Sequence, residues 1–346
     1  MNGAPSTDSI ARTRRLFGRL ALTAGLLTLI VIAASAFIRH TQAGLACADW
    51  PACYARIGAQ PEAAAPSTGV FIARLFHRLA ASGALGLIIG MLLIGRAPRT
   101  AFKRERILAL AALLIAVGLA GLGIATPGAE YPAVPVGNLL GGYLMIAVLA
   151  ALTGAVASPD SATPQLPATT PLRSIALVLL VLLAFAFVQA GLGTLIGTKF
   201  ALTACTELVR CPDFAINEFA LAALNPFRRL VIIDGHAVAP VAAAGIHVMH
   251  RLLGIGIATT ALVLAYALRS TDGRAARLLM ALALVTPLLG ATAVVAMPSL
   301  AVTVLHNAAA AVLVATLAYI AARRTVYGCT AGPVNTLRND RPFRSR

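Results

Sequence analysis

The chain has 346 residues, of which 59% are hydrophobic and only 12% are charged. A water-soluble protein carries about 25% charged residues, so this composition excludes a soluble globular domain, a disordered chain and a small disulfide scaffold. It indicates an integral membrane protein. The net charge of +16 would by itself suggest nucleic-acid binding, but the placement of the charges, described below, argues against that class.

Eight stretches are long and apolar enough to cross about 30 Å of hydrocarbon as helices. They lack the alternating pattern of membrane β-strands, and unpaired backbone amides cannot face lipid. We therefore predict an all-α membrane protein with eight transmembrane helices, the first of which runs on too far to be a removable signal peptide. In chain order the predicted spans cover residues 17–38, 70–95, 107–126, 133–157, 174–197, 241–268, 278–296 and 300–322.

Basic residues are distributed unequally between the two sides of this topology. An even number of spans puts both termini on one side, and the tails and loops of that side carry 19 Lys and Arg residues against 6 in the opposite loops. Positive residues gather on the cytoplasmic side of membrane proteins. We therefore expect both termini to be cytoplasmic, membrane lipid to contact the basic residues, and nucleic acid to be no partner.

The two halves of the chain repeat the same order of features. Each half has a span, a long outer loop with two cysteines, a span with a His-Arg dipeptide, a short basic inner loop and two more spans. We interpret this as a duplication that gives two pseudo-symmetric four-helix bundles. The predicted divisions are an N-terminal four-helix half (1–157), a cytoplasmic linker (158–173), a C-terminal four-helix half (174–322) and a cytoplasmic tail (323–346).

Both cysteine pairs, Cys47 with Cys53 and Cys205 with Cys211, have five residues between their members. Both lie in predicted outer loops, where the compartment is oxidising, so we expect two disulfides. Two roles remain open for these disulfides. They are either structural cross-links (staples) of the loops or redox-active pairs that pass electrons to a nearby centre. Cys329, alone in the tail, is expected to be a free thiol.

Four of the six histidines fall inside predicted spans, where an ionisable ring is costly and therefore suggests a function. At the helical rise, His77, His250 and His306 lie at similar depths, roughly 9–14 Å below the outer ends of their spans. One alternative is that these rings only form hydrogen bonds to backbone within the bundle. His40 and His236, in outer loops, are assigned no role.

Neutral imidazoles from two helices, an apolar sheath and nearby cations are what a haem requires. We predict His250 and His306 as its axial ligands. Arg78 and Arg251, which adjoin His77 and His250, are expected to be propionate partners or interfacial residues. His247, three residues before His250, is expected to contact a propionate or to support the ligand. Zinc fits less well, because the sequence places no carboxylate or thiolate at the depth of the rings.

Five segments of the chain form a recognisable pattern. They are AGLACADWPAC (43–53), RLFHRLAASGALG (74–86), CTELVRCPDF (205–214), HVMHRLLG (247–254) and LLGATAVVAMPSLAVTVLHNAAAA (288–311). Together they resemble the bacterial and mitochondrial haem A synthases, and the similarity covers the chain apart from its tails.

The resemblance implies an oxidoreductase of the bacterial inner membrane that oxidises the C8 methyl of haem O to the formyl of haem A for cytochrome c oxidase. It implies haem b as cofactor, haem O as substrate, and a haem O synthase and an electron donor as partners. The sequence also permits a homo-oligomer, since Gly86 and Gly90 have the spacing of close helix packing.

Carried over residue by residue, the resemblance assigns the haem b ligands to His250 and His306 and one substrate-haem ligand to His77. The family's second N-terminal histidine is replaced by Asn138, and a glutamate implicated in catalysis is replaced by Arg74. All 12 acidic residues fall in predicted loops, so no span supplies a carboxylate as a general base.

These departures leave three functions open at the level of sequence. The first is a haem A synthase with a variant N-terminal site. The second is a catalytically inactive or divergent haem-binding paralogue in oxidase assembly. The third is a membrane cytochrome b that passes electrons.

Overall fold

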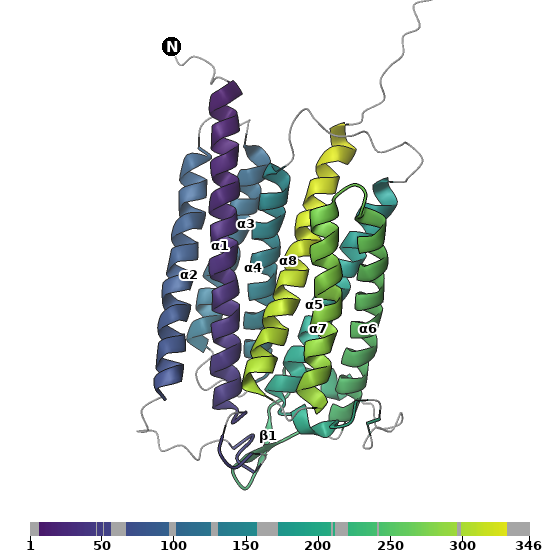
Figure 1. The fold of residues 1–346 in the computed structure, drawn as a ribbon. Helices are drawn as coiled ribbons and strands as arrows, with labels where there is room; N and C mark the ends of the chain where they lie inside the picture. Colours follow the sequence, from purple (N-terminus) through teal and green to yellow (C-terminus); the bar gives the residue numbers. More distant parts are fainter. Residues whose placement is uncertain are drawn as a thin grey trace, which may run out of the picture.

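The structure, a computed structural model, describes residues 7–45, 47–50, 52–56, 67–96, 102–125, 131–157, 172–208, 210–211, 221–240, 242–295 and 299–330. Within these residues, eight helices are long and apolar enough to span a membrane, which confirms the predicted all-α membrane fold (Figure 1). They are α1 (Thr7–Gln42), α2 (Thr68–Ile94), α3 (Lys103–Ala125), α4 (Ala133–Val156), α5 (Leu172–Thr198), α6 (Ala243–Leu268), α7 (Gly273–Val295) and α8 (Leu300–Thr330).

Several helices extend beyond the predicted spans. Helix α8 continues to Thr330, so the predicted tail begins as helix, and most of the predicted linker lies outside the described residues. The expectation that every acidic residue lies in a loop is wrong for Asp8 and Glu105, which lie in the first turns of α1 and α3. Glu105 pairs with Arg14 of α1, with 3.6 Å between Oε1 and Nε. Helices continue past the apolar stretch because Lys, Arg and Glu are themselves good helix formers.

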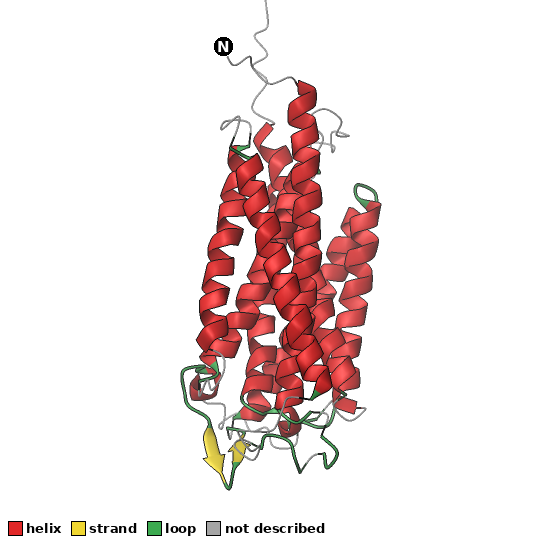
Figure 2. Cartoon of the chain, turned by 90° about the vertical axis from the view of Figure 1, so that its left-hand side faces the viewer, coloured by secondary structure: helices red, strands yellow, loops and turns green. Residues whose placement is uncertain are grey.

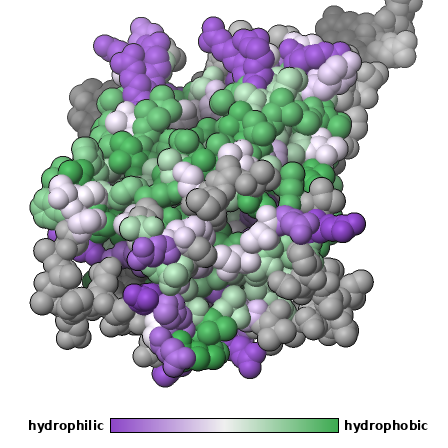
Figure 3. Space-filling model, turned by 60° about the horizontal axis from the view of Figure 1, so that its bottom comes forward, coloured by the Kyte–Doolittle hydropathy of each residue, from purple (hydrophilic) through white to green (hydrophobic). Residues whose placement is uncertain are grey.

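The outer surface of the bundle is apolar. Ile124 is 83% exposed, Leu114 is 64% exposed and Leu288 is 65% exposed. In Figure 3 an apolar region covers the middle of the visible face, and hydrophilic side chains gather toward its two ends. A face this apolar would be unstable in water, so it faces lipid, and the chain is a multi-pass membrane protein.

The helices pack as two rings of four (Figure 1). In one ring α1 contacts α2, α2 contacts α3, α3 contacts α4 and α4 contacts α1; α5 to α8 contact one another in the same order. The rings meet where α4 packs on α8, α1 packs on α8 and α5 packs on α4. If α1 is exchanged with α5, α2 with α6, α3 with α7 and α4 with α8, the same set of helix contacts results. A duplication would produce this pattern. The duplication itself stays a prediction.

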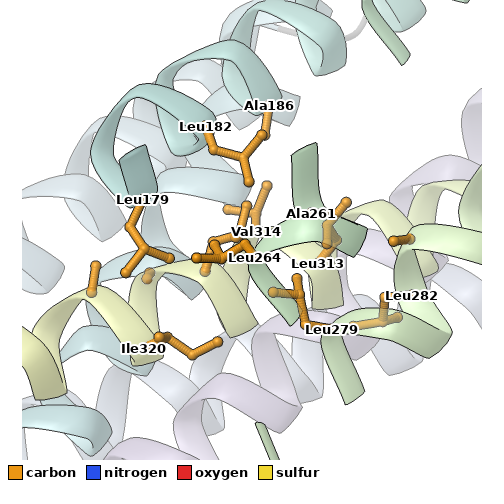
Figure 4. Close-up of a cluster of buried hydrophobic side chains, with 14 of the residues drawn as sticks. Leu179, Leu182, Ala186, Ala261, Leu264, Leu279, Leu282, Leu313, Val314 and Ile320 are labelled. Carbon is orange, nitrogen blue, oxygen red and sulfur yellow. The ribbon is translucent and has the colours of Figure 1, made fainter. Parts of the chain in front are cut away.

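Each ring has an apolar core, and that of the C-terminal ring extends to Ile32 of α1 and to Tyr143, Ile146 and Ala147 of α4. In the C-terminal ring, Leu179, Leu264, Leu279 and Val314 belong to one cluster of buried side chains (Figure 4). In the N-terminal ring a second cluster includes Phe17 of α1. Leu and Ala recur three or four residues apart on the inward faces, which is the spacing that lines one side of a helix.

The two rings touch most closely along α4 and α8. A Cβ added to Gly154 of α4 would lie 2.5 Å from the carbonyl oxygen of Tyr319 in α8, so only glycine permits this backbone approach. Nearer the other end, the hydroxyl of Tyr143 donates a 2.8 Å hydrogen bond to the carbonyl of Asn307. The halves are therefore joined by packing and by a buried polar contact.

The end of the bundle opposite the start of α1 and the end of α8 carries a small hairpin (Figures 1 and 2). Its strands, β1 (Val231–Ile233) and β2 (His236–Val238), are antiparallel and are joined through Asp234 and Gly235, both with positive φ. Asp-Gly suits such a two-residue turn. Two short 3₁₀ helices, η1 (Leu202–Ala204) and η3 (Leu221–Leu224), lie in the same long loop.

The loop that follows α1 docks on this hairpin. The amide of Ala237 donates a 2.8 Å hydrogen bond to the carbonyl of Ala55, and Arg56 and His236 form a β-bridge. Tyr54 is buried beside them, and burial raises the pKa of its hydroxyl. The loops that follow α1 and α5 thus form one cap at this end of the bundle, which the sequence analysis did not predict.

Lys199, just after α5, is a second anchor of the cap. It is 4% exposed, and its ammonium donates hydrogen bonds of 2.7 and 2.9 Å to the carbonyls of Ala223 and Asn225. Burial lowers the pKa of Lys199, and the nearby Arg228 lowers it further. The lysine ties the loop around η3 to the end of α5.

Candidate functional site

The structure brings His250 and His306 together inside the C-terminal ring. Their ring centres are 6.3 Å apart, and the ring planes are inclined at 66°. They come from α6 and α8, which are opposite members of the ring, with α5 and α7 between them. His250 lies seven and His306 six residues after the first residue of its helix, so their depths match as the sequence predicted.

The ring of His306 is oriented by α7. Its Nδ1 lies 2.9 Å from the carbonyl oxygen of Thr286. A carbonyl only accepts, so Nδ1 carries the proton and Nε2 keeps its lone pair. Such an arrangement is the usual preparation of a histidine for binding a metal through its other nitrogen.

The position of His250 is fixed by α5. The side-chain amide of Gln189 donates a 2.8 Å hydrogen bond to the carbonyl of His250 and lies 3.4 Å from Nε2 of the ring. The other ring nitrogen, Nδ1, is buried and has no hydrogen-bond partner within the described residues. Buried polar atoms are normally paired, so this orphan suggests a missing ligand.

Two glycines make room beside the rings. A Cβ added to Gly193 of α5 would lie 2.9 Å from Cε1 of His250, and one added to Gly290 of α7 would lie 3.1 Å from Cε1 of His306. The intervening helices therefore present bare backbone to the two imidazoles. A larger side chain at either position would displace a ring.

These features fit a metal held between the two imidazoles. Metal–nitrogen bonds of about 2 Å, with about 1 Å from each nitrogen to its ring centre, place two such centres about 6 Å apart. Within the described part of the chain no group of three or more His, Cys, Asp or Glu could hold a metal ion. A metal with only two protein ligands needs its remaining bonds from elsewhere, and a porphyrin supplies four.

His247 and Arg251 contact the outer loop. His247 is 5% exposed, and its Nε2 lies 2.7 Å from the carbonyl of Ala201. Arg251 donates hydrogen bonds of 2.8, 3.1 and 3.0 Å to the carbonyls of Glu207, Leu208 and Cys205. Both residues thus hold the cysteine-containing loop above His250. Their predicted contacts with a propionate stay predictions.

The N-terminal ring presents its candidate residues differently. His77 of α2 is half-buried and forms no hydrogen bond with the described residues, whereas Arg74 and Arg78 on the same helix are exposed. Asn138 of α4 is half-buried. Helices α2 and α4 are opposite members of their ring, as α6 and α8 are of theirs. No hydrogen bond joins His77 to Asn138.

The cysteines are paired as predicted. Cys47 is bonded to Cys53 and Cys205 to Cys211, with Cα–Cα distances of 6.2 and 4.9 Å. The second pair lies close to the histidine site, because Arg251, which follows His250, donates to the carbonyl of Cys205. Both proposed roles, staple and redox pair, are compatible with this position.

Sequence reasoning missed four residues that complete the site: Gln189, Gly193, Thr286 and Gly290. Gln189 had a usable signal, since it is the one amide side chain within an otherwise apolar span. The others had none, because a backbone carbonyl and two glycines in a glycine-rich chain do not identify the helix that they face.

Comparisons with known proteins identify the family of the chain. The family model described as cytochrome oxidase assembly protein matches residues 18–318. The chain is also similar to the heme A synthase of Shewanella oneidensis strain MR-1, with 30% identity over 321 residues that cover 85% of this chain and 92% of that protein. Together these matches show that the chain belongs to the haem A synthase family of cytochrome oxidase assembly proteins.

Proposed function

We propose that the protein is a haem A synthase that oxidises the C8 methyl of haem O to the formyl of haem A. Membership of the family supports a role in haem A biosynthesis for oxidase assembly. The observation that carries the proposal is the pair His250 and His306, whose ring centres lie 6.3 Å apart at the same depth.

In this proposal the C-terminal ring holds a haem b between His250 and His306. When bound, haem supplies one-electron redox chemistry. The protein's part is to hold the ligands: Thr286 fixes the protonated nitrogen of His306, and Gln189 fixes the backbone of His250. Arg251 secures the neighbouring loop through the carbonyls of Cys205, Glu207 and Leu208.

The N-terminal ring is proposed to bind the substrate haem O through His77. Arg74 and Arg78 flank His77 along α2 and supply positive charge for the propionates of the substrate. Asn138, on the opposite helix, is a weak ligand for iron, so the opposite face of the substrate iron stays open.

Within the described residues no carboxylate lies at the depth of the histidine, so proton transfer at this site is proposed not to use one. Glu105 lies in the first turn of α3, at the far end of the bundle, and is paired with Arg14. The proton is instead taken by water, by a propionate or by an outer-loop acid such as the exposed Asp49.

A second function is favoured by a specific observation, the replacement of the family glutamate and histidine by Arg74 and Asn138. These substitutions suit a haem-binding paralogue that acts in oxidase assembly without oxidising haem O. The cytochrome b alternative would require reduction by a quinone without any change in haem type.

One experiment separates these functions. The protein is produced in a bacterial strain that lacks its own haem A synthase but makes haem O, and the haems are extracted and identified by mass. We expect haem A with the wild-type chain and none with His77→Ala. If the wild-type chain binds haem but no haem A forms, the protein is a haem-binding paralogue and not a haem A synthase.

We also propose that both termini face the cytoplasm and that the cap carrying the disulfides lies outside the bacterial inner membrane. The excess of positive residues on the terminal side supports this orientation. A reporter that is active only in the cytoplasm should be active when it is fused after Arg346. If only a periplasmic reporter is active at that position, the orientation is reversed.

A further inference from the structure

Arg39, near the outer end of α1, is a cation without an anion. Its Nε is buried and has no hydrogen-bond partner, and its Nη2 lies 3.3 Å from Nε2 of His40, which is 4% exposed. No described acidic side chain forms an ion pair with it. The residue as a whole is half-buried. A guanidinium whose Nε is withdrawn from solvent and unpaired is costly, so this position suits an anion that the polypeptide itself does not supply.

The pair Arg39 and His40 lies next to the histidine site on the side of α5. A Cβ added to Gly193 would lie 2.9 Å from Cε1 of His250, and one added to Gly197 would lie 3.3 Å from Cε1 of His40. Residues four apart share one helix face and are separated by about 6 Å along the axis. His40 is therefore one turn nearer the outer end than His250, along the same face.

Arg39 is also linked to His306, the second candidate haem ligand, through Tyr143. Arg39 interacts electrostatically with the buried hydroxyl of Tyr143. That hydroxyl donates to the carbonyl of Asn307, the residue after His306. Arg39 is thus linked to the segment of α8 that carries His306 through Tyr143, and to the face of α5 that meets His250 through His40, although it belongs to a helix of the N-terminal ring.

We propose that Arg39, supported by His40, binds a propionate carboxylate of the haem that His250 and His306 hold. This inference rests on the proposed function. A haem carries its two carboxylates on one edge, and a guanidinium binds a carboxylate through two parallel hydrogen bonds. Arg251, the sequence candidate for this role on α6, already donates to three loop carbonyls. Arg39 completes the site from across the interface of the halves.

The test compares haem b with its dimethyl ester, in which both carboxylates are blocked. Full-length protein, purified in detergent from haem-depleted cells, is titrated with each ferric compound, and binding is followed by absorbance. Arg39→Gln should weaken binding of haem b by about tenfold to a hundredfold, the usual range for a charge-assisted hydrogen bond, and should leave binding of the ester unchanged. Arg228→Gln, at an exposed arginine of the same cap, is the matched control and should change neither.

The reduction potential gives an independent readout. Ferric haem carries one more positive charge than ferrous haem, so loss of a neighbouring cation favours the ferric form and lowers the potential. Arg39→Gln should lower the midpoint potential, whereas Arg39→Lys, which keeps the charge, should lower it less.

Two results would overturn the inference. One is equal weakening of haem b and ester binding by Arg39→Gln, which would indicate a structural role; the other is no change in either. If Arg39→Gln does not fold, equal affinity of the wild-type chain for haem b and ester overturns it instead. A wild-type chain that shows no bis-histidine spectrum with either compound would contradict the proposed function rather than the role of Arg39.

Discussion

Tyr143 of α4 donates a 2.8 Å hydrogen bond to the carbonyl of Asn307, which follows the candidate ligand His306 in α8. Tyr143 is 2% exposed, so this contact lies in the interior. A helix of the N-terminal ring thereby fixes the segment of α8 that carries a ligand of the C-terminal ring. The two halves are consequently coupled at the level of the site as well as by packing.

Removal of this bond should destabilise the protein without changing its haem ligands. Tyr143→Phe leaves the ring in place and deletes the hydroxyl, which should cost about 1 kcal/mol of unfolding free energy. Thermal unfolding in detergent measures the effect. Tyr266→Phe is the control, because Tyr266 is 61% exposed and its hydroxyl forms no hydrogen bond within the described residues. Equal melting temperatures of the two variants would contradict the role of the bond.

Gly193→Ala should weaken haem binding. The new Cβ would lie 2.9 Å from Cε1 of His250, so the ring must move. Overpacking of this kind costs roughly 1–3 kcal/mol, which corresponds to haem affinity reduced by about fivefold to a hundredfold. The measurement is a haem titration followed at the Soret band. Gly256→Ala on α6, where an added Cβ meets nothing within 4 Å, should bind as the wild type does; a matching loss there would show a general helix effect.

Alkylation should find the outer-loop cysteines unreactive. The disulfides Cys47–Cys53 and Cys205–Cys211 leave Cys329 as the free thiol of the five cysteines. Intact mass after alkylation without reduction should therefore increase by one label, and after reduction by five. Five labels on freshly prepared, unreduced protein would mean that the pairs are open in the cell.

The next prediction concerns Asn138, the variant residue of the N-terminal site. Asn138→His restores an imidazole on the helix opposite His77, so iron bound in that ring should change from five-coordinate to six-coordinate. The absorption of the C-terminal haem should stay as it is, and Asn138→Gln serves as the control without a ring. An unchanged coordination state in Asn138→His would mean that residue 138 does not face the substrate iron.

Much of the fold could be predicted because the bilayer imposes it. A span must be apolar over about 30 Å and must be helical, so hydropathy located all eight helices. Helix ends were less predictable, because polar residues continue a helix once it has formed. Arg39 illustrates the consequence: it was counted with the loop charges, but α1 runs to Gln42, so Arg39 is a half-buried residue of the last turn of this helix.

The candidate site could be predicted only in part for a related reason. Counting residues from the span ends placed His250 and His306 at one depth, and the structure places their rings together. Depth does not say which helices are neighbours, so the contacts of Gln189 and Thr286 with these histidines required the packed rings. The docking of the first outer loop on the hairpin depends on contacts between residues 180 or more positions apart and left no pattern in the sequence.

The most direct test of the account is the absorption and electron paramagnetic resonance spectrum of the purified chain and of its His250→Ala and His306→Ala variants. The account predicts one low-spin haem with two histidine ligands in the wild type, and its loss in each variant with a folded, helical protein remaining by circular dichroism. A low-spin bis-histidine spectrum that persists unchanged in both variants would contradict the assignment of these two residues as the haem ligands.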